Sequence, residues 1–341
     1  MGEITDILNA DSFFDSEEMR AAEKMFMPDM QNEPSSNVPN ESYFRGATAL
    51  APNSAKYGTY RSRTKEYGTS YFLKIPASVE HDSTWDLLKE EFQINRKLTE
   101  EHCPHIVKYY ELAECSDGRP FIRAEYIHGE TLADYLHYDA QKRQKDDEVI
   151  VDYFRNNANM KRFIRQFLEC LQRMHELSVV HHDLKPGNLL IDCVAGNLYI
   201  LDFDLSVGPS STNKSYGWTD GYEDPEAAEL WESRMADWYD VFGPQFDIYS
   251  FGVIIKEIFK SYKLRMPSEY KRILNKCTCK RKNRYQHVED IFHDFMDYWM
   301  HEGRNSEDFL KMTKTYQAAA DGNAKAKQMI QEFLEYEKEL K

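Results

Sequence analysis

The sequence predicts an α+β fold, and three observations support this prediction. Residues 43–75 consist of short apolar runs and turns, which is typical of strands, and Ser70–Ile75 is the clearest run. Longer stretches follow in which apolar residues recur at helical spacing, above all in residues 160–177. The length of 341 residues suits two modest domains, or one two-lobed domain with extensions.

Composition and charge exclude several classes of protein. The net charge of −15 argues against non-specific nucleic-acid binding and against attraction to anionic membranes. No apolar run approaches the roughly 20 residues of a membrane-spanning helix, so no membrane insertion is expected. The six cysteines are scattered, and only Cys277 and Cys279 lie close together. We therefore expect reduced thiols and a cytoplasmic location, with a nuclear one left open.

Both ends of the chain are predicted to be extensions. Residues 1–40 carry nine acidic residues against two basic ones, and Gln31–Ser42 is rich in Pro, Asn and Ser. Residues 1–42 are therefore predicted to form an acidic, partly disordered arm. Residues 301–341 are predicted to form a helical extension, with a break near Ala318–Ala324. Either extension is a candidate surface for a protein partner.

One polar loop between two apolar runs holds the residues with the clearest chemistry. In Val179–Ile191, the loop contains Asp183, Lys185 and Asn188, and a second carboxylate, Asp202, ends the next apolar run. If these side chains converge from two adjacent strand ends, they suit metal-assisted phosphoryl transfer. One carboxylate would position an attacking hydroxyl, the lysine would steady the γ-phosphate, and the amide and second carboxylate would hold Mg²⁺.

These residues match the catalytic loop and the metal loop of the protein-kinase superfamily, which the chain resembles. The resemblance implies a two-lobed kinase fold, with a small, mostly β lobe over residues 43–127 and a large, mostly α lobe over residues 128–300. It also implies ATP and Mg²⁺ as cofactors and a protein as substrate. Asp183 and Lys185 are then the predicted catalytic residues, and Asn188 and Asp202 are the predicted ligands of Mg²⁺.

The small lobe supplies the predicted nucleotide contacts. A helix is expected from Asp82–Ser83 to Leu98, and on it Glu91 shares a face with apolar residues. The resemblance implies that Lys74, the only charged residue in its apolar run, pairs with Glu91 and holds the α- and β-phosphates. It also implies that backbone groups of Glu125 and Ile127 bind the adenine edge.

Three segments of the large lobe extend the resemblance. Thr219–Glu226 is similar to the end of a kinase activation segment, with Asp224 where alanine is usual. Asp247–Gly252 resembles the start of the central helix of that lobe. The family pairs an arginine with the glutamate of its Pro-Glu motif, which implies a pair between Arg284 and Glu226.

The sequence departs from the family at the nucleotide site. The stretch that should cover the phosphates, Asn53–Tyr60, keeps only the last glycine, Gly58, so weaker nucleotide binding is expected. Phe72 and Tyr60 occupy positions above the adenine, where they could stack on the base or fill its site. Asp204 replaces the glycine after Asp202-Phe203, where its carboxylate could help to hold metal or could repel the triphosphate.

Three functions are open at this point. The first is a Ser/Thr protein kinase, because the resemblance makes Lys185-Pro186 and Thr219 favour Ser/Thr acceptors. The second is a pseudokinase scaffold whose pocket is filled or binds nucleotide weakly. The third is a small-molecule kinase, against which the large-lobe segments argue. The acidic charge permits a basic protein substrate.

Overall fold

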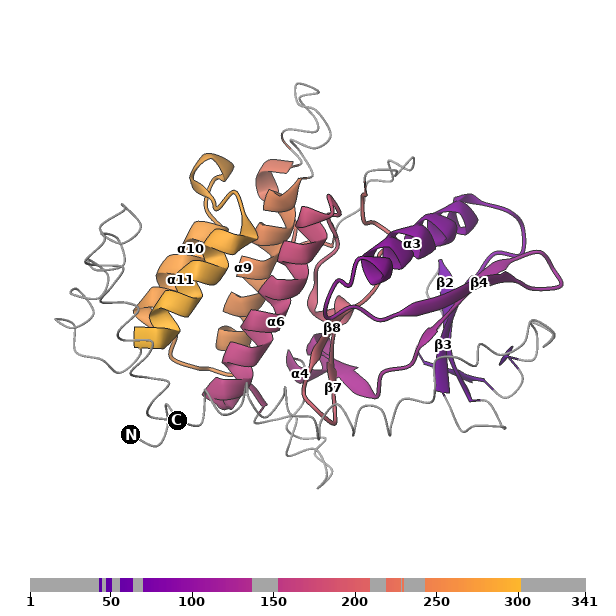
Figure 1. Cartoon of the computed structure of the whole chain (residues 1–341), viewed down its shortest axis with the longest axis horizontal. Coiled ribbons are helices and arrows are strands. Elements are labelled where there is room, and N and C mark those ends of the chain that lie inside the picture. The colour runs from indigo at the N-terminus through magenta and orange to yellow at the C-terminus, as the bar shows by residue number, and fades with distance from the viewer. Residues whose placement is uncertain are drawn as a thin grey trace.

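The computed structural model describes residues 43–44, 47–50, 56–63, 70–136, 153–208, 219–227, 229 and 243–301. It has a lobe built on a sheet and a lobe built on helices, which lie side by side (Figure 1). This arrangement confirms the predicted two-lobed α+β fold. The predicted arm over residues 1–42 lies outside the described residues, which begin at Tyr43. The predicted C-terminal extension also lies outside them, because α11 ends at His301.

The small lobe contains one antiparallel sheet with strand order β1-β2-β3-β5-β4. Its strands are β1 (Thr48–Ala49), β2 (Tyr57–Arg63), β3 (Ser70–Pro76), β4 (Tyr109–Glu114) and β5 (Pro120–Glu125). Side chains alternate along β3, so Leu73 and Ile75 pack on one face of the sheet and Phe72 and Lys74 belong to the other.

Helix α3 (Ser83–Glu100) packs against this sheet, and it begins where the sequence predicts. The Asp82 side chain caps its first turn by accepting a hydrogen bond from the Thr84 amide at 2.9 Å. Leu88 and Leu98 are fully buried on its inner face. The same face carries Glu91, so a carboxylate enters the interior only because the helical period places it there.

The large lobe begins with a small antiparallel sheet of order β6-β7-β8, formed by β6 (Gly129–Thr131), β7 (Leu189–Asp192) and β8 (Leu198–Ile200). The loop that contains Asp183 and the short η5 (Pro186–Asn188) come directly before β7 in the chain. The other helical elements of the large lobe are α4 (Leu132–Leu136), η4 (Tyr153–Arg155), α6 (Asn157–Glu176), α9 (Pro244–Ser261), α10 (Ser268–Cys277), η6 (Arg281–Asn283) and α11 (Val288–His301).

Apolar faces of α6, α9 and α11 form the core of the large lobe. The ring centroids of Phe167 on α6 and Phe251 on α9 lie 5.2 Å apart, and Phe295 on α11 lies 6.5 Å from Phe251. All three side chains are buried. This core supports the β6-β7-β8 sheet, because Leu189, Ile191 and Ile200 belong to the same cluster. The loop that contains Asp183 therefore rests on a rigid base.

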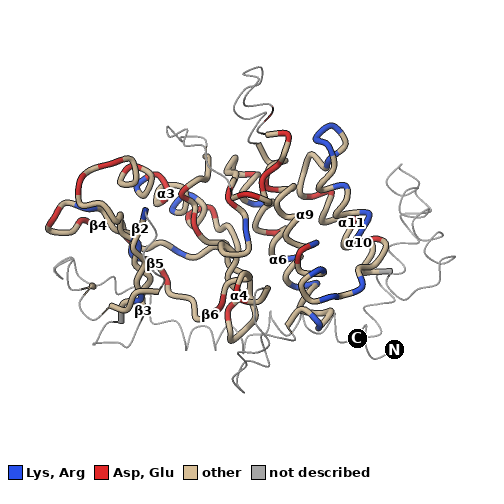
Figure 2. Tube along the Cα trace, turned by 180° about the vertical axis from the view of Figure 1, so that it is seen from behind, with Lys and Arg blue, Asp and Glu red and all other residues tan. Residues whose placement is uncertain are grey.

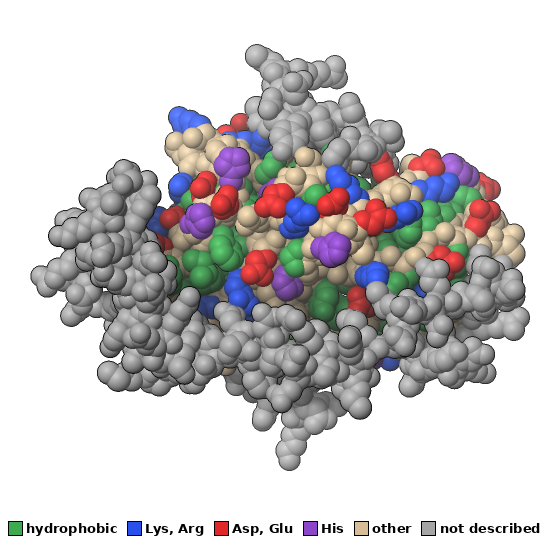
Figure 3. Space-filling view, in the orientation of Figure 1, with side chains coloured by type: hydrophobic (Ala, Val, Ile, Leu, Met, Phe, Trp, Pro, Cys, Tyr) green, Lys and Arg blue, Asp and Glu red, His purple; other side chains and the backbone are tan. Residues whose placement is uncertain are grey.

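Charge is unevenly distributed over the described surface. Lys and Arg gather around α10 and the turn that follows it, at the end of the large lobe away from the small lobe (Figure 2). On the face seen in Figure 3, acidic, basic and histidine side chains are interspersed with apolar ones. All six cysteines are described, and each is a free thiol as predicted. Within the described residues, no helix is long and apolar enough to span a bilayer.

Candidate active site

Lys74 joins the two lobes at the centre of the site. Its Nζ donates hydrogen bonds to Glu91 Oε2 at 2.8 Å and to Asp202 Oδ1 at 2.6 Å. The predicted pair between Lys74 and Glu91 is therefore present. Burial by itself lowers the pKa of Lys74, but the carboxylates of Asp202 and Glu91 outweigh it, and the pKa lies well above the ordinary value.

Glu91 has a second partner that the sequence did not reveal. The hydroxyl of Tyr109 on β4 donates to Glu91 Oε1 at 2.6 Å, so both carboxylate oxygens are bonded. Burial raises the pKa of Glu91 to about 7, against the opposing effect of the Lys74 ammonium. At Asp202 the same ammonium outweighs burial and lowers the pKa of the carboxyl. These contacts fix α3 relative to β3 and to the loop after β8.

The loop before β7 gathers a second set of side chains around Asp183. Lys185 Nζ donates to Asp183 Oδ2 at 2.5 Å, and Asn188 Nδ2 donates to the same oxygen at 3.0 Å. The hydroxyl of Thr219 donates to Asp183 Oδ1 at 2.7 Å and accepts from Lys185 Nζ at 3.0 Å. The structure therefore brings the predicted catalytic residues Asp183 and Lys185 together with Thr219, which comes from a later part of the chain.

Asp247, near the start of α9, binds the backbone of this loop through hydrogen bonds. Its two carboxylate oxygens accept hydrogen bonds from the backbone amides of His181 and His182, at 2.9 and 3.0 Å, and one also contacts His175 Nε2 at 2.9 Å. His182 has a φ of 66°, a left-handed conformation that is unfavourable for a side chain other than glycine. The buried carboxylate of Asp247 stabilises this strained backbone directly before Asp183.

The donor set suits a hard divalent cation. Carboxylate oxygens of Asp183, Asp202 and Asp204 lie within 4.8 Å of one another. Asn188 uses its amide nitrogen to bind Asp183, at 2.8 Å to the carbonyl and 3.0 Å to the carboxylate, which leaves its amide oxygen as a possible ligand. Oxygen ligands of this kind are those that Mg²⁺ prefers. The residues present therefore fit the Mg²⁺ that the sequence predicts.

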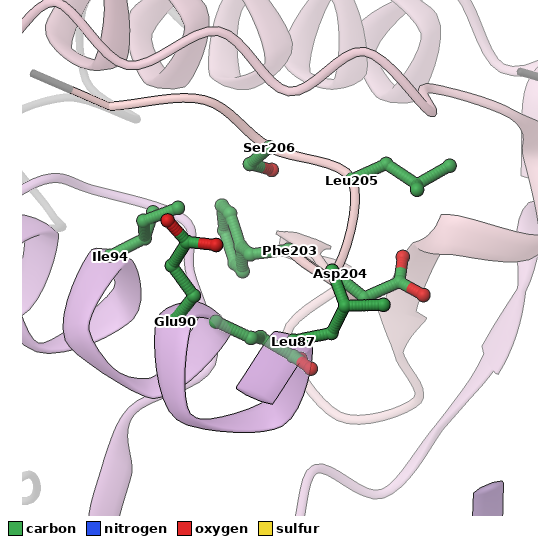
Figure 4. Close-up of a pocket in the computed structure, with 8 residues that line it drawn as sticks. Leu87, Glu90, Ile94, Phe203, Asp204, Leu205 and Ser206 are labelled. Carbon is green, nitrogen blue, oxygen red and sulfur yellow. The ribbon is translucent and has the colours of Figure 1, made fainter. Parts of the chain in front are cut away.

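Asp204 is the unusual member of this set. Its side chain is 9% exposed, and it forms an ion pair with Lys56 Nζ at 3.8 Å. Burial and the neighbouring charge of Asp202 raise the pKa of Asp204 to about 6. Asp202 itself has a φ of 63°, so the backbone turns sharply just before Phe203 and Asp204. Figure 4 shows their two side chains pointing in opposite directions.

The prediction that Tyr60 lies above the adenine is wrong. Tyr60 on β2 is paired with Leu73 on β3, so it lies on the outer face of the sheet, where its ring packs against Phe44 at 5.8 Å. Phe72 does lie on the cleft face, in a cluster that includes Leu201. Counting back from Lys74 gave the wrong face because the strand register sets Thr59 opposite Lys74 and Tyr60 opposite Leu73.

Tyr57 lies on the face of the sheet that carries Lys74, in the cluster that packs against α3. Its side chain is buried beside Lys74, whose Nζ lies 4.5 Å from the centre of the tyrosine ring, and its hydroxyl donates to the Thr84 carbonyl at 3.3 Å. Arg61 lies on the same face of β2, with its guanidinium 4.6 Å from the ring centre of Tyr126. A tyrosine at the start of β2 was visible in the sequence, but its orientation depends on the strand register.

The remaining predicted nucleotide contacts lie at the edges of the cleft. Glu125 ends β5, and its amide already donates to the Lys108 carbonyl at 2.9 Å, so its own carbonyl is the group left for a ligand. Ile127 follows in the connection to β6 and packs against the cleft-side cluster. Gly58 lies on β2, where a Cβ would come within 2.9 Å of the Tyr60 ring. Ala124 is fully buried behind this region.

The expected pair between Arg284 and Glu226 is also corrected. Arg284 donates to both carboxylate oxygens of Asp224, at 2.7 and 3.0 Å, and Arg281 Nε donates to Asp224 as well. Glu226 accepts a hydrogen bond from the Arg281 amide at 2.9 Å. Asp224 is fully buried, and although burial raises its pKa, the two arginines outweigh this effect and lower it. Asp224, a carboxylate where the family usually has alanine, was the feature of the sequence that could have indicated this ion-pair cluster.

The sequence profile of the protein kinase domain matches residues 56–340. The chain therefore belongs to the protein kinase domain family. This result confirms the resemblance that the catalytic loop indicated, and it argues against a small-molecule kinase.

Three relatives show how far the similarity extends. CBL-interacting protein kinase 8 of Oryza sativa subsp. japonica is 28% identical over 203 residues, covering 59% of this chain and 40% of the relative. The probable serine/threonine-protein kinase MARK-C of Dictyostelium discoideum is 31% identical over 156 residues, covering 45% of this chain and 17% of the relative. CBL-interacting serine/threonine-protein kinase 24 of Arabidopsis thaliana is 26% identical over 218 residues, covering 62% of this chain and 44% of the relative. The chain thus spans less than half the length of these curated relatives.

Proposed function

We propose that the chain is a Ser/Thr protein kinase that transfers the γ-phosphate of ATP to a protein substrate. The observation that carries the proposal is the position of Asp202. Its carboxylate binds Lys74 of the small lobe at 2.6 Å and lies within 4.8 Å of carboxylate oxygens of Asp183 in the large lobe. The groups that we propose to bind phosphate, to bind metal and to act in catalysis therefore lie close together between the lobes.

Asp183 has the surroundings of a residue that orients a hydroxyl group. It already accepts a hydrogen bond from the alcohol of Thr219 at 2.7 Å, which supports its capacity to accept one from a Ser or Thr of a substrate and then to take up the proton. Lys185, 2.5 Å from Asp183, is placed to neutralise charge on the transferred phosphoryl group. Asn188 and Asp202 would hold Mg²⁺, which when bound neutralises charge on the phosphates.

The small lobe would hold the nucleotide. In this proposal Lys74, positioned by Glu91, binds the α- and β-phosphates, and Gly58 lies in the segment that covers them. The carbonyl of Glu125 and the backbone of Ile127 bind the adenine edge. Phe72 lies on the cleft face of β3 and is placed to pack on the base. ATP and Mg²⁺ are therefore the proposed cofactors.

Transfer of labelled phosphate from ATP to a generic basic protein tests this proposal. We expect the wild-type chain to label the protein and Asp183→Asn to lose at least about 100-fold of the rate, because the carboxylate that accepts the proton is removed. Glu80→Gln, an exposed charge change on the small lobe, is the matched control and should label like wild type. Equal labelling by wild type and Asp183→Asn would remove the enzyme proposal.

A pseudokinase scaffold is the second candidate, and the position of Tyr57 favours it. The tyrosine ring occupies space beside Lys74, and Lys74 already binds Asp202, so both phosphate and metal ligands are engaged within the protein. Thermal unfolding with and without millimolar Mg·ATP separates the two candidates. Stabilisation supports a kinase that binds nucleotide, and its absence supports the scaffold.

Partners and location follow from the same proposal. The acidic net charge favours a basic protein substrate, and we propose the arm of residues 1–42 and the extension of residues 301–341 as surfaces for a protein partner. The free thiols agree with a cytoplasmic location, which stays a prediction.

A further inference from the structure

The backbone after Asp202 fixes the direction of the Asp204 side chain. Phe203 is 1% exposed, and its ring packs against that of His181 at 5.2 Å. Two further bonds close the turn, because the Ser206 amide donates to the Phe203 carbonyl and the Ser206 hydroxyl donates to the His181 carbonyl, both at 3.1 Å. Phe203 is thus anchored toward α3, and the Asp204 side chain points away from it (Figure 4), with its carboxylate within 4.8 Å of those of Asp183 and Asp202.

The geometry of the three carboxylates matches shared coordination of one ion. Divalent cations hold oxygen ligands at about 2.0–2.6 Å, so two ligands of the same ion lie at most about 5 Å apart. Ligand oxygens of Asp183, Asp202 and Asp204 satisfy this limit, since all lie within 4.8 Å of one another. Asp204 can therefore reach the same ion as Asp202.

The Asp204 side chain is largely buried and accepts no hydrogen bond from a described residue, although it forms an ion pair with Lys56. Asp183 accepts bonds from Lys185, Asn188 and Thr219, and Asp202 accepts one from Lys74. Asp204, at 9% exposure, has only Lys56 Nζ nearby, at 3.8 Å, and that lysine side chain is 51% exposed. Burying an ionised carboxylate is costly unless a cation or donors compensate it. An exposed lysine beyond hydrogen-bond distance provides little compensation.

We propose that Asp204 is a ligand of a divalent cation, shared with Asp202, and that it allows the site to hold one Mg²⁺ or Mn²⁺ before nucleotide binds. A second carboxylate ligand supplies the negative charge that the phosphates of ATP would otherwise contribute. The proposal rests on the Mg²⁺ site proposed above, but it does not depend on phosphoryl transfer. Failure of the phosphate-transfer assay would therefore leave it intact.

Titration of the full chain with Mn²⁺ alone, followed by the electron paramagnetic resonance signal of free Mn²⁺, tests the proposal. We expect one Mn²⁺ per wild-type chain without nucleotide, and at least about 10-fold weaker binding for Asp204→Asn. Glu80→Gln, which removes an exposed charge elsewhere in the small lobe, should bind as wild type. Wild type that binds no Mn²⁺ at millimolar concentration, or Asp204→Asn that binds as tightly as wild type, would overturn the proposal.

Two further variants separate metal binding from a structural role of Asp204. If the residue served only to pair with Lys56, Lys56→Met would weaken Mn²⁺ binding as much as Asp204→Asn, and this result would also overturn the proposal. We expect instead that Lys56→Met binds Mn²⁺ at least as tightly as wild type, because a competing cation is removed. Asp204→Gly introduces no new side-chain atoms, so it provides the same comparison should Asp204→Asn fail to fold.

Discussion

Substituting Asp224 by asparagine should destabilise the large lobe more than any change at Glu226. Asp224 binds the side chains of both Arg281 and Arg284, and it is fully buried. The side chain of Arg284 is 1% exposed, and it also donates to the carbonyls of Cys279 and Gln245. Asp224→Asn keeps the shape of the side chain but removes the negative charge that both guanidinium groups bind in the interior.

The size of the effect follows from the burial of the cluster. Removing one partner of a buried ion pair typically costs about 3–5 kcal/mol, because the remaining charge stays desolvated. Stabilities of whole domains are about 5–15 kcal/mol, so this loss is a large fraction of the total. Glu226→Gln removes only a carboxylate that accepts one bond from the Arg281 amide at 2.9 Å, and the glutamine oxygen can still accept it. We expect at most about 1 kcal/mol for that change.

Denaturant and thermal unfolding of the two variants at pH 7.5 provide the measurement. Asp224→Asn should unfold at clearly lower denaturant and at a Tm lower by on the order of 10 °C, and Glu226→Gln should stay close to wild type. The pKa of Asp224 is lowered in the folded protein, so its contribution is present above about pH 3.8 and is lost only as pH falls below that value. A larger loss for Glu226→Gln than for Asp224→Asn would refute this account of the cluster.

Two other predictions concern the cleft. Tyr57→Ala should tighten Mg·ATP binding several-fold in calorimetry, because it removes the ring beside Lys74. The same change should lower the Tm, because packing is lost. Unchanged or weaker binding would show that the ring does not compete with nucleotide. Because the pKa of Asp204 is raised to about 6, metal-free wild type should lose up to about 3 kcal/mol of unfolding free energy as pH rises from 4 to 8 relative to Asp204→Asn. Parallel pH profiles of the two proteins would contradict the second prediction.

Local spacing predicted the parts of the site that depend on short stretches of chain. The helical period predicted that Glu91 faces inward, and the resemblance to protein kinases implied its pair with Lys74, which the structure contains. Asp183 and Asn188 come from one loop, so their approach to each other is also a local property. The sequence likewise predicted the burial of the apolar face of α6, because Phe167 and its neighbours recur at helical spacing.

Predictions failed where they depended on strand register or compared equivalent charges. The face occupied by Tyr60 depends on the pairing register of β2 with β3, and an error of one residue moves every side chain of the strand to the other face. With the observed register, Tyr57 lies on the face that carries Lys74. In the same way, spacing cannot decide whether Arg284 binds Asp224 or Glu226, because both carboxylates are within two residues of each other. Depth of burial decides it, and burial is a property of the folded lobe.

The contacts of Lys74 link the two proposals made for the cleft. In the protein without ligands, its ammonium binds Asp202 at 2.6 Å and so supplies the positive charge that a metal ion would bring to that carboxylate. When Lys74 turns to the phosphates of a nucleotide, Asp202 needs another cation. A second ligand at Asp204 would keep an ion ready for this exchange, at a carboxylate that no lysine approaches within hydrogen-bond distance among the described residues. In this account Asp204, the acidic residue after Asp202-Phe203, acts as a metal ligand and need not repel the triphosphate.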